Sequence, residues 1–241
     1  GYDDLIIGAS FADPNGSFSG SSYVVFGTGN AFGPTVNLST LDGTTGFRLD
    51  GQEGNQSGRS VSSAGDINGD GYDDLIIASY AAGPNGTNSG SSYVVFGTAS
   101  AFASTVNLST LDGTNGFRLD GEAVNDISGW SVSSAGDING DGYDDLIIGA
   151  PYSDPNGGSS GSSYVVFGGA ANMGATVDLS DLDGTYGFRL DGVAANDSSG
   201  GSVSSAGDIN GDGYDDLIIG AYLADPNGSA SGSSYVVFGS G

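Results

Sequence analysis

Short apolar runs, separated by stretches rich in Gly, Asn, Asp and Ser, recur along the whole chain. Four segments represent the pattern, and we call them A (61–65), B (75–78), C (93–97) and D (117–120). Each is only a few residues long and is bounded by turn residues, which is typical of β-strands, and no helical apolar period is evident. The pattern therefore predicts an all-β chain.

The four predicted strands differ in which of their faces are apolar. B and C are apolar on both faces, so both faces have to be covered. D alternates, with Phe117 and Leu119 on one face and Arg118 and Asp120 on the other, as in an outer strand that meets water. A is small and polar, which suits a crowded position near a central axis. We therefore predict a β-propeller, in which four-stranded antiparallel sheets, the blades, stack around an axis.

The same unit returns about every 70 residues, because Gly-Tyr-Asp-Asp-Leu-Ile-Ile begins at 1, 71, 142 and 213. The predicted blade units are 1–51, 52–121, 122–192 and 193–241. The two outer units supply three strands each and the two inner units four each, which predicts 14 strands or about three and a half blades. We expect the chain to be a fragment of a longer array.

The loop between A and B has the composition of a calcium site. Ca²⁺ takes about 6–8 oxygen ligands, and this loop places oxygen donors at alternate positions. The loop occurs whole at 66–74, 137–145 and 208–216, which predicts three Ca²⁺ sites. The predicted ligands, with the backbone carbonyl of each Tyr, are Asp66, Asn68, Asp70, Tyr72, Asp74, Asp137, Asn139, Asp141, Tyr143, Asp145, Asp208, Asn210, Asp212, Tyr214 and Asp216.

Two other interpretations of these loops are weaker. An EF-hand needs a bidentate Glu at position 12, but Ile77, Ile148 and Ile219 stand there. An Asx-rich turn without metal remains the simplest alternative. Asp73, Asp144 and Asp215, at position 8, are expected to face away from the ion. The incomplete copy at the N-terminus keeps only Tyr2 and Asp4, and we predict no ion there.

Charge and composition exclude several classes of function. The chain has 29 acidic residues, four arginines, no lysine and no histidine, for a formal charge of −25, which disfavours nucleic acid and anionic membrane partners. It has no cysteine, so no disulfide can stabilise the fold, and bound metal is the remaining way to cross-link it. It has no apolar stretch long enough for membrane insertion. Without His, Cys or Lys, and with the recurring carboxylates assigned to metal, we expect no enzymatic activity.

The run Gly-Trp-Ser-Val-Ser-Ser-Ala-Gly-Asp-Ile-Asn-Gly-Asp-Gly-Tyr-Asp-Asp-Leu-Ile-Ile-Gly-Ala-Pro, residues 129–151, resembles the FG-GAP repeat. This repeat builds the N-terminal propeller of integrin α-subunits and its bacterial relatives. The resemblance implies seven blades of four strands in a complete domain, with calcium in the A–B hairpin of several blades. It also implies a ligand face at the end opposite the calcium loops. The Phe of the FG element is replaced by Ser at 57, 128 and 199.

Three functions fit these observations. The first is a secreted, calcium-stabilised module at the cell surface or outside the cell, used for cell adhesion or for binding a protein or glycan ligand through the B–C and D–A loops. The alternative is a structural subunit that self-associates blade to blade into an extracellular filament, sheath or surface layer. The third is a non-catalytic accessory propeller of a larger enzyme.

Two further groups of side chains receive structural interpretations. We expect Arg118 and Asp120 to form an exposed ion pair of little energetic weight, as do their counterparts in the other units. The counterparts are Arg48 with Asp50 and Arg189 with Asp191. The single tryptophan, Trp130, is predicted to pack at a blade edge rather than to recognise a ligand.

Overall fold

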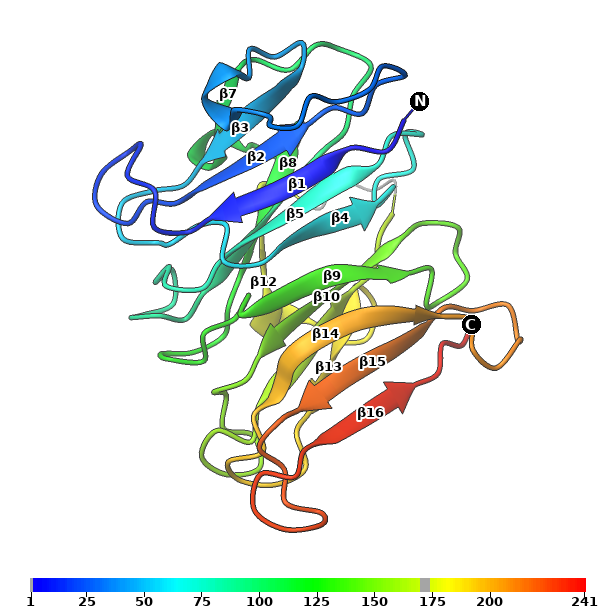
Figure 1. The fold of residues 1–241 in the computed structure, drawn as a ribbon. Coiled ribbons are helices and arrows are strands. Elements are labelled where there is room, and N and C mark those ends of the chain that lie inside the picture. The colour runs from blue at the N-terminus through cyan, green and yellow to red at the C-terminus, as the bar shows by residue number, and fades with distance from the viewer. Residues whose placement is uncertain (1, 170–173) are drawn as a thin grey trace.

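The computed structural model describes residues 2–169 and 174–241 and is all-β, apart from three single-turn 3₁₀ helices (Figure 1). Residue 1 and residues 170–173, which fall in the predicted units 1–51 and 122–192, lie outside this description. Four sheets follow each other along the chain, one for each predicted unit. The prediction of propeller blades is confirmed.

Each blade pairs its strands in the predicted antiparallel order. The first blade contains β1 (Leu5–Ala9), β2 (Ser21–Val25) and β3 (Gly46–Asp50). The second contains β4 (Val61–Gly65), β5 (Asp74–Ser79), β6 (Ser91–Val95) and β8 (Gly116–Asp120). The third contains β9 (Ser131–Gly136), β10 (Asp145–Ala150), β11 (Ser162–Val166) and β13 (Gly187–Asp191). The fourth contains β14 (Ser199–Gly207), β15 (Asp216–Ala221) and β16 (Ser233–Val237). All fourteen predicted strands are therefore present, although strand C begins and ends about two residues earlier than predicted.

Two strands were missed by the sequence prediction. Both lie in C–D connections: β7 (Thr105–Asn107) and β12 (Thr176–Asp178). Each leaves its own blade and pairs in parallel with strand D of the preceding blade, β7 with β3 and β12 with β8. A 3₁₀ helix follows each of them, Leu108–Thr110 and Leu179–Asp181, and a third spans Leu38–Thr40. The described residues therefore contain sixteen strands rather than fourteen. The sequence did not predict the two extra strands, because three-residue strands that pair across blades carry no periodic signal of their own.

The hydrophobic core lies between neighbouring blades. Val24, Phe47 and Leu49 of the first blade pack against Ile77 and Tyr93 of the second. A second cluster joins the second and third blades, and a third cluster joins the third and fourth. The inner strands β4, β9 and β14 lie side by side in the middle of the molecule, as Figure 1 shows. This arrangement agrees with the expected position of strand A near an axis.

The ion pairs on strand D form, but they are less exposed than the sequence predicted. Arg48 contacts Asp50 at 2.7 Å and Arg118 contacts Asp120 at 2.6 Å. The side chains of Asp50 and Asp120 are only 3% and 7% exposed, whereas that of Asp191 is 35% exposed. The prediction of exposed pairs is therefore wrong for the first two blades, where β7 and β12 add a further strand outside strand D.

None of the helices in the described residues is long and apolar enough to cross a membrane.

Candidate metal centre

The three acidic loops join strand A to strand B at the same end of their blades, between β4 and β5, β9 and β10, and β14 and β15. Each loop follows an irregularity at the end of strand A, where the register with strand B shifts. In the first loop Gly69 and Gly71 have φ of 73° and 89°, a left-handed conformation that favours glycine. These two residues allow nine residues to close a tight hairpin.

Backbone amides hold the acidic side chains of each loop in place. In the first loop, Asp66 accepts hydrogen bonds from the N–H of Asp70 at 3.0 Å and of Gly71 at 2.9 Å. Asn68 Oδ1 accepts from Asp70 N at 2.8 Å, and Asp70 Oδ1 accepts from Tyr72 N at 3.0 Å. The same bonds recur in the loops at 137–145 and 208–216. Three loops of one sequence therefore share one geometry.

The last predicted ligand of each loop, at position 9, is a buried carboxylate. Asp74 is fully buried and accepts hydrogen bonds from Ile67 N at 3.1 Å and from Gly97 N at 2.7 Å. Asp145 is held in the same way by the equivalent amides. Burial, together with the charges of Asp70 and Asp66, raises the pKa of Asp74 to about 7. Burial likewise raises the pKa of Asp145 to about 7. Both carboxylates lie where negative charge is poorly compensated.

The donor set fits Ca²⁺ chemically. Every predicted ligand offers oxygen, which is what Ca²⁺ prefers, and a carboxylate oxygen that accepts one N–H bond keeps a lone pair for a cation. The four arginines make their contacts elsewhere, three with strand-D carboxylates and Arg59 with Trp130. Within residues 2–169 and 174–241, however, no three acidic side chains converge into a preassembled metal cluster. Closure around an ion requires side-chain rotation and the amide and carbonyl oxygens, and the ligand set stays a prediction.

The Asp at position 8 has a role that the sequence did not reveal. Asp144 Oδ2 accepts a hydrogen bond from Asp66 N at 2.8 Å, so it bridges the acidic loops of the second and third blades. Asp215 accepts from Asp137 N at 3.0 Å in the next pair of blades. Asp73 is exposed. These bonds link consecutive loops into a row, and the repetition of Asp-Asp in every loop was the only signal of it.

The incomplete N-terminal copy keeps part of the same geometry. Asp4 Oδ1 accepts a hydrogen bond from Gly27 N at 2.7 Å, as Asp74 does from Gly97 N. Position 9 therefore closes onto the end of strand C in the first blade as well.

The opposite end of the blades is built from the B–C and D–A loops, which are bonded to each other. Ser57 N donates to Ser19 O at 3.2 Å and Ile127 N donates to Asn88 O at 3.0 Å. The two kinds of loop thus share one surface, as the sequence predicted. Seven large apolar side chains are exposed on these loops: Phe11, Phe18, Val124, Tyr152, Val193, Tyr222 and Leu223.

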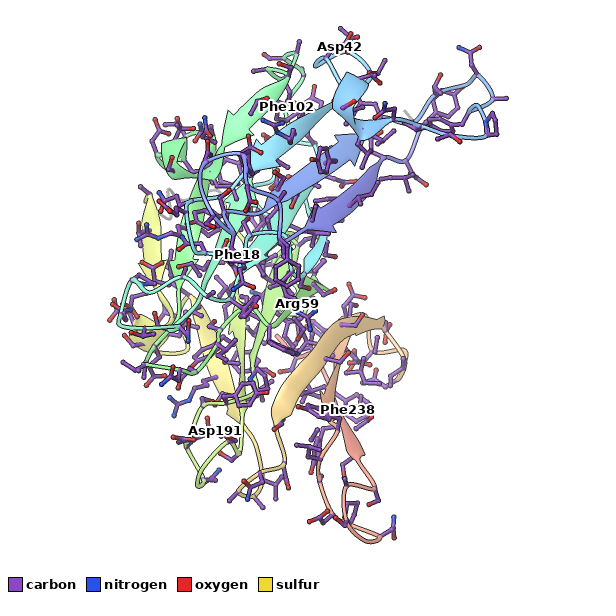
Figure 2. All side chains as sticks on the ribbon, turned by 60° about the vertical axis from the view of Figure 1, so that its left-hand side comes forward. Phe18, Asp42, Arg59, Phe102, Asp191 and Phe238 are labelled. Atoms are coloured by element: carbon purple, nitrogen blue, oxygen red, sulfur yellow. The ribbon has the colours of Figure 1, made fainter. Side chains whose placement is uncertain are left out.

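Trp130 lies in this end of the structure and packs between blades. Its ring makes edge contacts with Tyr80 and Tyr152, with centroid distances of 5.6 Å and 6.1 Å. The guanidinium of Arg59, labelled in Figure 2, lies 4.5 Å from its ring centroid. The contacts join residues of the second and third blades, and the predicted packing role is confirmed.

Comparison with known proteins gives one family and several relatives. A family described as FG-GAP repeat matches residues 57–95, 128–166 and 199–237, each covering strands A to C of one blade. Phosphatidylinositol-glycan-specific phospholipase D of Dictyostelium discoideum is 31% identical over 190 residues, 73% of this chain and 19% of the relative. Its Bos taurus counterpart is 38% identical over 114 residues, 46% of this chain and 13% of the relative. Integrin alpha-PS2 of Drosophila melanogaster is 29% identical over 237 residues, 92% of this chain and 16% of the relative. The chain thus spans less than a fifth of these relatives.

Proposed function

We propose that this chain, which is an FG-GAP repeat protein with integrin-like repeats, is a secreted, calcium-stabilised propeller that binds a protein or glycan ligand outside the cell or at its surface. One observation carries the proposal. The two ends of the blades have different chemistry, with linked acidic loops at one end and exposed apolar side chains on bonded loops at the other. The first end stabilises the stack, and the second is available to a partner.

Calcium supplies the stabilising charge at the first end. The buried position-9 carboxylates face two further acids in their own loop and no basic residue, so a divalent cation offsets repulsion there. Because Asp144 and Asp215 tie consecutive loops together, an ion in one loop also steadies the contact with the next blade. Similarity to integrin α-subunits supports an extracellular location and a role in adhesion.

The ligand surface at the second end is rich in aromatic and aliphatic side chains. Phe11 and Phe18 form an edge contact with centroids 6.0 Å apart, and both are more than half exposed. Aromatic residues are enriched at protein interfaces because they bury large areas with few rotatable bonds. An exposed group of this kind on a strongly acidic protein indicates recognition by apolar contact rather than by charge.

An array of extracellular proteins and glycans tests this proposal. Labelled chain is applied with Ca²⁺, and binding is compared with that of a Phe18→Ser, Tyr222→Ser variant. Tyr186→Ser is the control, because Tyr186 is more exposed than Phe18 or Tyr222 but lies in the C–D connection at the other end. Loss of binding in the double variant alone supports the proposal. Equal loss in both variants, or retention in both, contradicts it.

A second candidate, assembly into an extracellular array, is favoured by the outer faces of the first and last blades. Leu5 is 60% exposed on β1, whereas its equivalent Leu146 on β10 is fully buried against a neighbouring blade. Val236 on β16 is 43% exposed, and its equivalent Val165 is fully buried. Sedimentation velocity over a concentration series tests this function, and a monomer at every concentration contradicts it.

The third candidate, an accessory propeller of an enzyme, is favoured by the similarity to phosphatidylinositol-glycan-specific phospholipase D. On this interpretation the 241 residues supply binding and not catalysis. We therefore expect the chain alone not to hydrolyse a glycosylphosphatidylinositol substrate.

A further inference from the structure

Consecutive acidic loops meet where position 8 of one loop contacts position 1 of the loop before it. The loops lie on neighbouring blades, whose inner strands β4, β9 and β14 run side by side (Figure 1). Asp66 N donates a hydrogen bond to Asp144 Oδ2 at 2.8 Å, and Asp144 N donates to Asp66 O at 3.4 Å. Asp137 and Asp215 repeat the two bonds at 3.0 Å and 3.1 Å. Position 8 therefore holds both backbone polar groups of a predicted ligand in the preceding blade.

A second contact joins the same loops through the end of strand C. Gly168 N donates to Asp145 Oδ1 at 2.8 Å, which is the buried position-9 carboxylate of the loop in its own blade. The next amide, Gly169 N, donates to Ile67 O at 2.9 Å in the loop of the preceding blade. The next pair of blades repeats both bonds at 3.0 Å, from Gly239 N to Asp216 Oδ1 and from Ser240 N to Ile138 O. Two adjacent amides thus connect a predicted ligand of one loop to the backbone of the other.

The tyrosine at position 7 packs on the preceding loop as well. The ring of Tyr143, whose carbonyl is a predicted ligand, lies so close to Gly69 that a Cβ at Gly69 would collide with it. The ring of Tyr214 lies against Gly140 in the same way. Positions 7, 8 and 9 of one loop, two predicted ligands and the Asp between them, are therefore all connected to the loop of the preceding blade.

These contacts give each loop a means of ordering its neighbour. When the loop at 137–145 closes around an ion, the carbonyl of Tyr143 and the carboxylate of Asp145 become fixed, and Asp144 lies between them. Asp144 in turn holds Asp66, so the first ligand of the preceding loop becomes fixed too. An ion that binds to a loop already ordered loses less conformational entropy and binds more tightly. Repulsion between two cations acts in the opposite direction, so positive coupling has to come from these contacts.

We propose that calcium binds cooperatively to consecutive acidic loops, and that Asp144 and Asp215 are positioning residues for the calcium site of the preceding blade. This coupling presupposes the calcium sites of the proposed function and adds the way in which they fill. Adjacent loops fill together over a narrow range of Ca²⁺ concentration, whereas loops separated by a blade fill independently. One hydrogen bond that forms fully only when both loops are ordered corresponds to about fivefold tighter binding of the second ion.

Two matched variants of the whole chain separate adjacent from distant loops. Asp212→Asn disables the loop at 208–216 and leaves two adjacent loops, whereas Asp141→Asn disables the middle loop and leaves two loops separated by a blade. Both variants carry the same exchange at position 5, where an amide oxygen can still accept the bond from the tyrosine N–H. In calcium titration calorimetry, fivefold coupling gives a Hill coefficient of about 1.4 for the adjacent pair, against about 1 for the separated pair.

Two substitutions at Asp144, each added to Asp212→Asn, test the bridging contact itself. Asp144→Ala removes the acceptor of the Asp66 N–H and should lower the Hill coefficient to about 1. Asp144→Asn removes the same charge but keeps an oxygen that accepts this bond, so the coefficient should stay above 1. A residue that acted only through its charge would give the same coefficient in both variants.

The unmodified chain provides a measurement that does not depend on whether a variant folds. Three independent sites of equal affinity give a Hill coefficient of about 1, and coupled sites give a larger value. Calcium binding with a coefficient of 1 or less, or equal coefficients for the adjacent and the separated pair, overturns the coupling and leaves the calcium sites in place. Absence of calcium binding by the unmodified chain overturns the calcium sites and the coupling together.

Discussion

The most direct perturbation of the proposed calcium loops exchanges one of two adjacent acids, Asp73 and Asp74. Asp74 is fully buried and is a predicted ligand, whereas Asp73 is exposed and is predicted to face away from the ion. Asp74→Asn and Asp73→Asn remove the same charge one residue apart. Only the first should abolish a calcium site.

The size of the effect follows from linkage. At a free Ca²⁺ concentration about ten times the dissociation constant, one site contributes about 1.4 kcal/mol, and three independent sites about 4 kcal/mol. For a chain of this length 1 kcal/mol corresponds to roughly 2–4 °C in melting temperature. Removal of calcium should therefore lower the melting temperature by about 8–16 °C in the unmodified chain.

Asp74→Asn also has a cost that does not depend on calcium. The carboxylate accepts hydrogen bonds from Ile67 N and Gly97 N on different oxygens, but an amide has only one oxygen. One buried N–H then lacks an acceptor, at about 1–3 kcal/mol. The informative quantity is consequently the difference in melting temperature with Ca²⁺ and with EGTA, in which this constant cost cancels.

Differential scanning calorimetry and calcium titration calorimetry are the assays. We expect the calcium-dependent increment of Asp74→Asn to fall to about two thirds of that of the unmodified chain, with stoichiometry reduced from three to two. Asp73→Asn should keep both values. An unmodified chain that melts at the same temperature with and without calcium would refute the reasoning, as would an equal loss of calcium binding in the two variants.

Three further predictions concern the blades themselves. Burial raises the pKa of Asp126 from 3.8 to about 6, so the folded state binds this proton more tightly and stability falls as pH rises from 3.8 to about 6. In urea titrations Asp126→Asn should remove that fall and add about 1–2 kcal/mol at pH 7, and a fall that persists in the variant would contradict the argument. Leu119→Ala should cost about 2–5 kcal/mol by chemical denaturation, because this side chain is fully buried on β8, which pairs with β12. Leu190→Ala should cost distinctly less, because Leu190 is only half buried, and equal costs would contradict the burial argument. Asp144→Ala should cost about 1–3 kcal/mol through the lost bond to the acidic loop of the preceding blade, and it should speed amide exchange in that loop; unchanged exchange would contradict the bridging role.

Local sequence was sufficient for much of this fold. Strands A to D, their order and the all-β class follow from short apolar runs bounded by turn residues, because these features depend on neighbours a few positions away. The acidic loops are predictable for the same reason, since their donors and the left-handed Gly69 and Gly71 lie within nine residues. The position of the B–C and D–A loops at one end follows from the antiparallel order alone.

Tertiary structure decided what happens between blades. β7 pairs with a strand more than fifty residues earlier, and Asp144 bonds to a backbone amide 78 residues away, so no local pattern encodes either contact. The identical Gly-Phe-Arg-Leu-Asp segments show this most clearly, since Asp50 is buried and Asp191 is exposed. Burial is a property of what packs against a residue, and in the described residues β7 and β12 pack outside strand D of the first two blades.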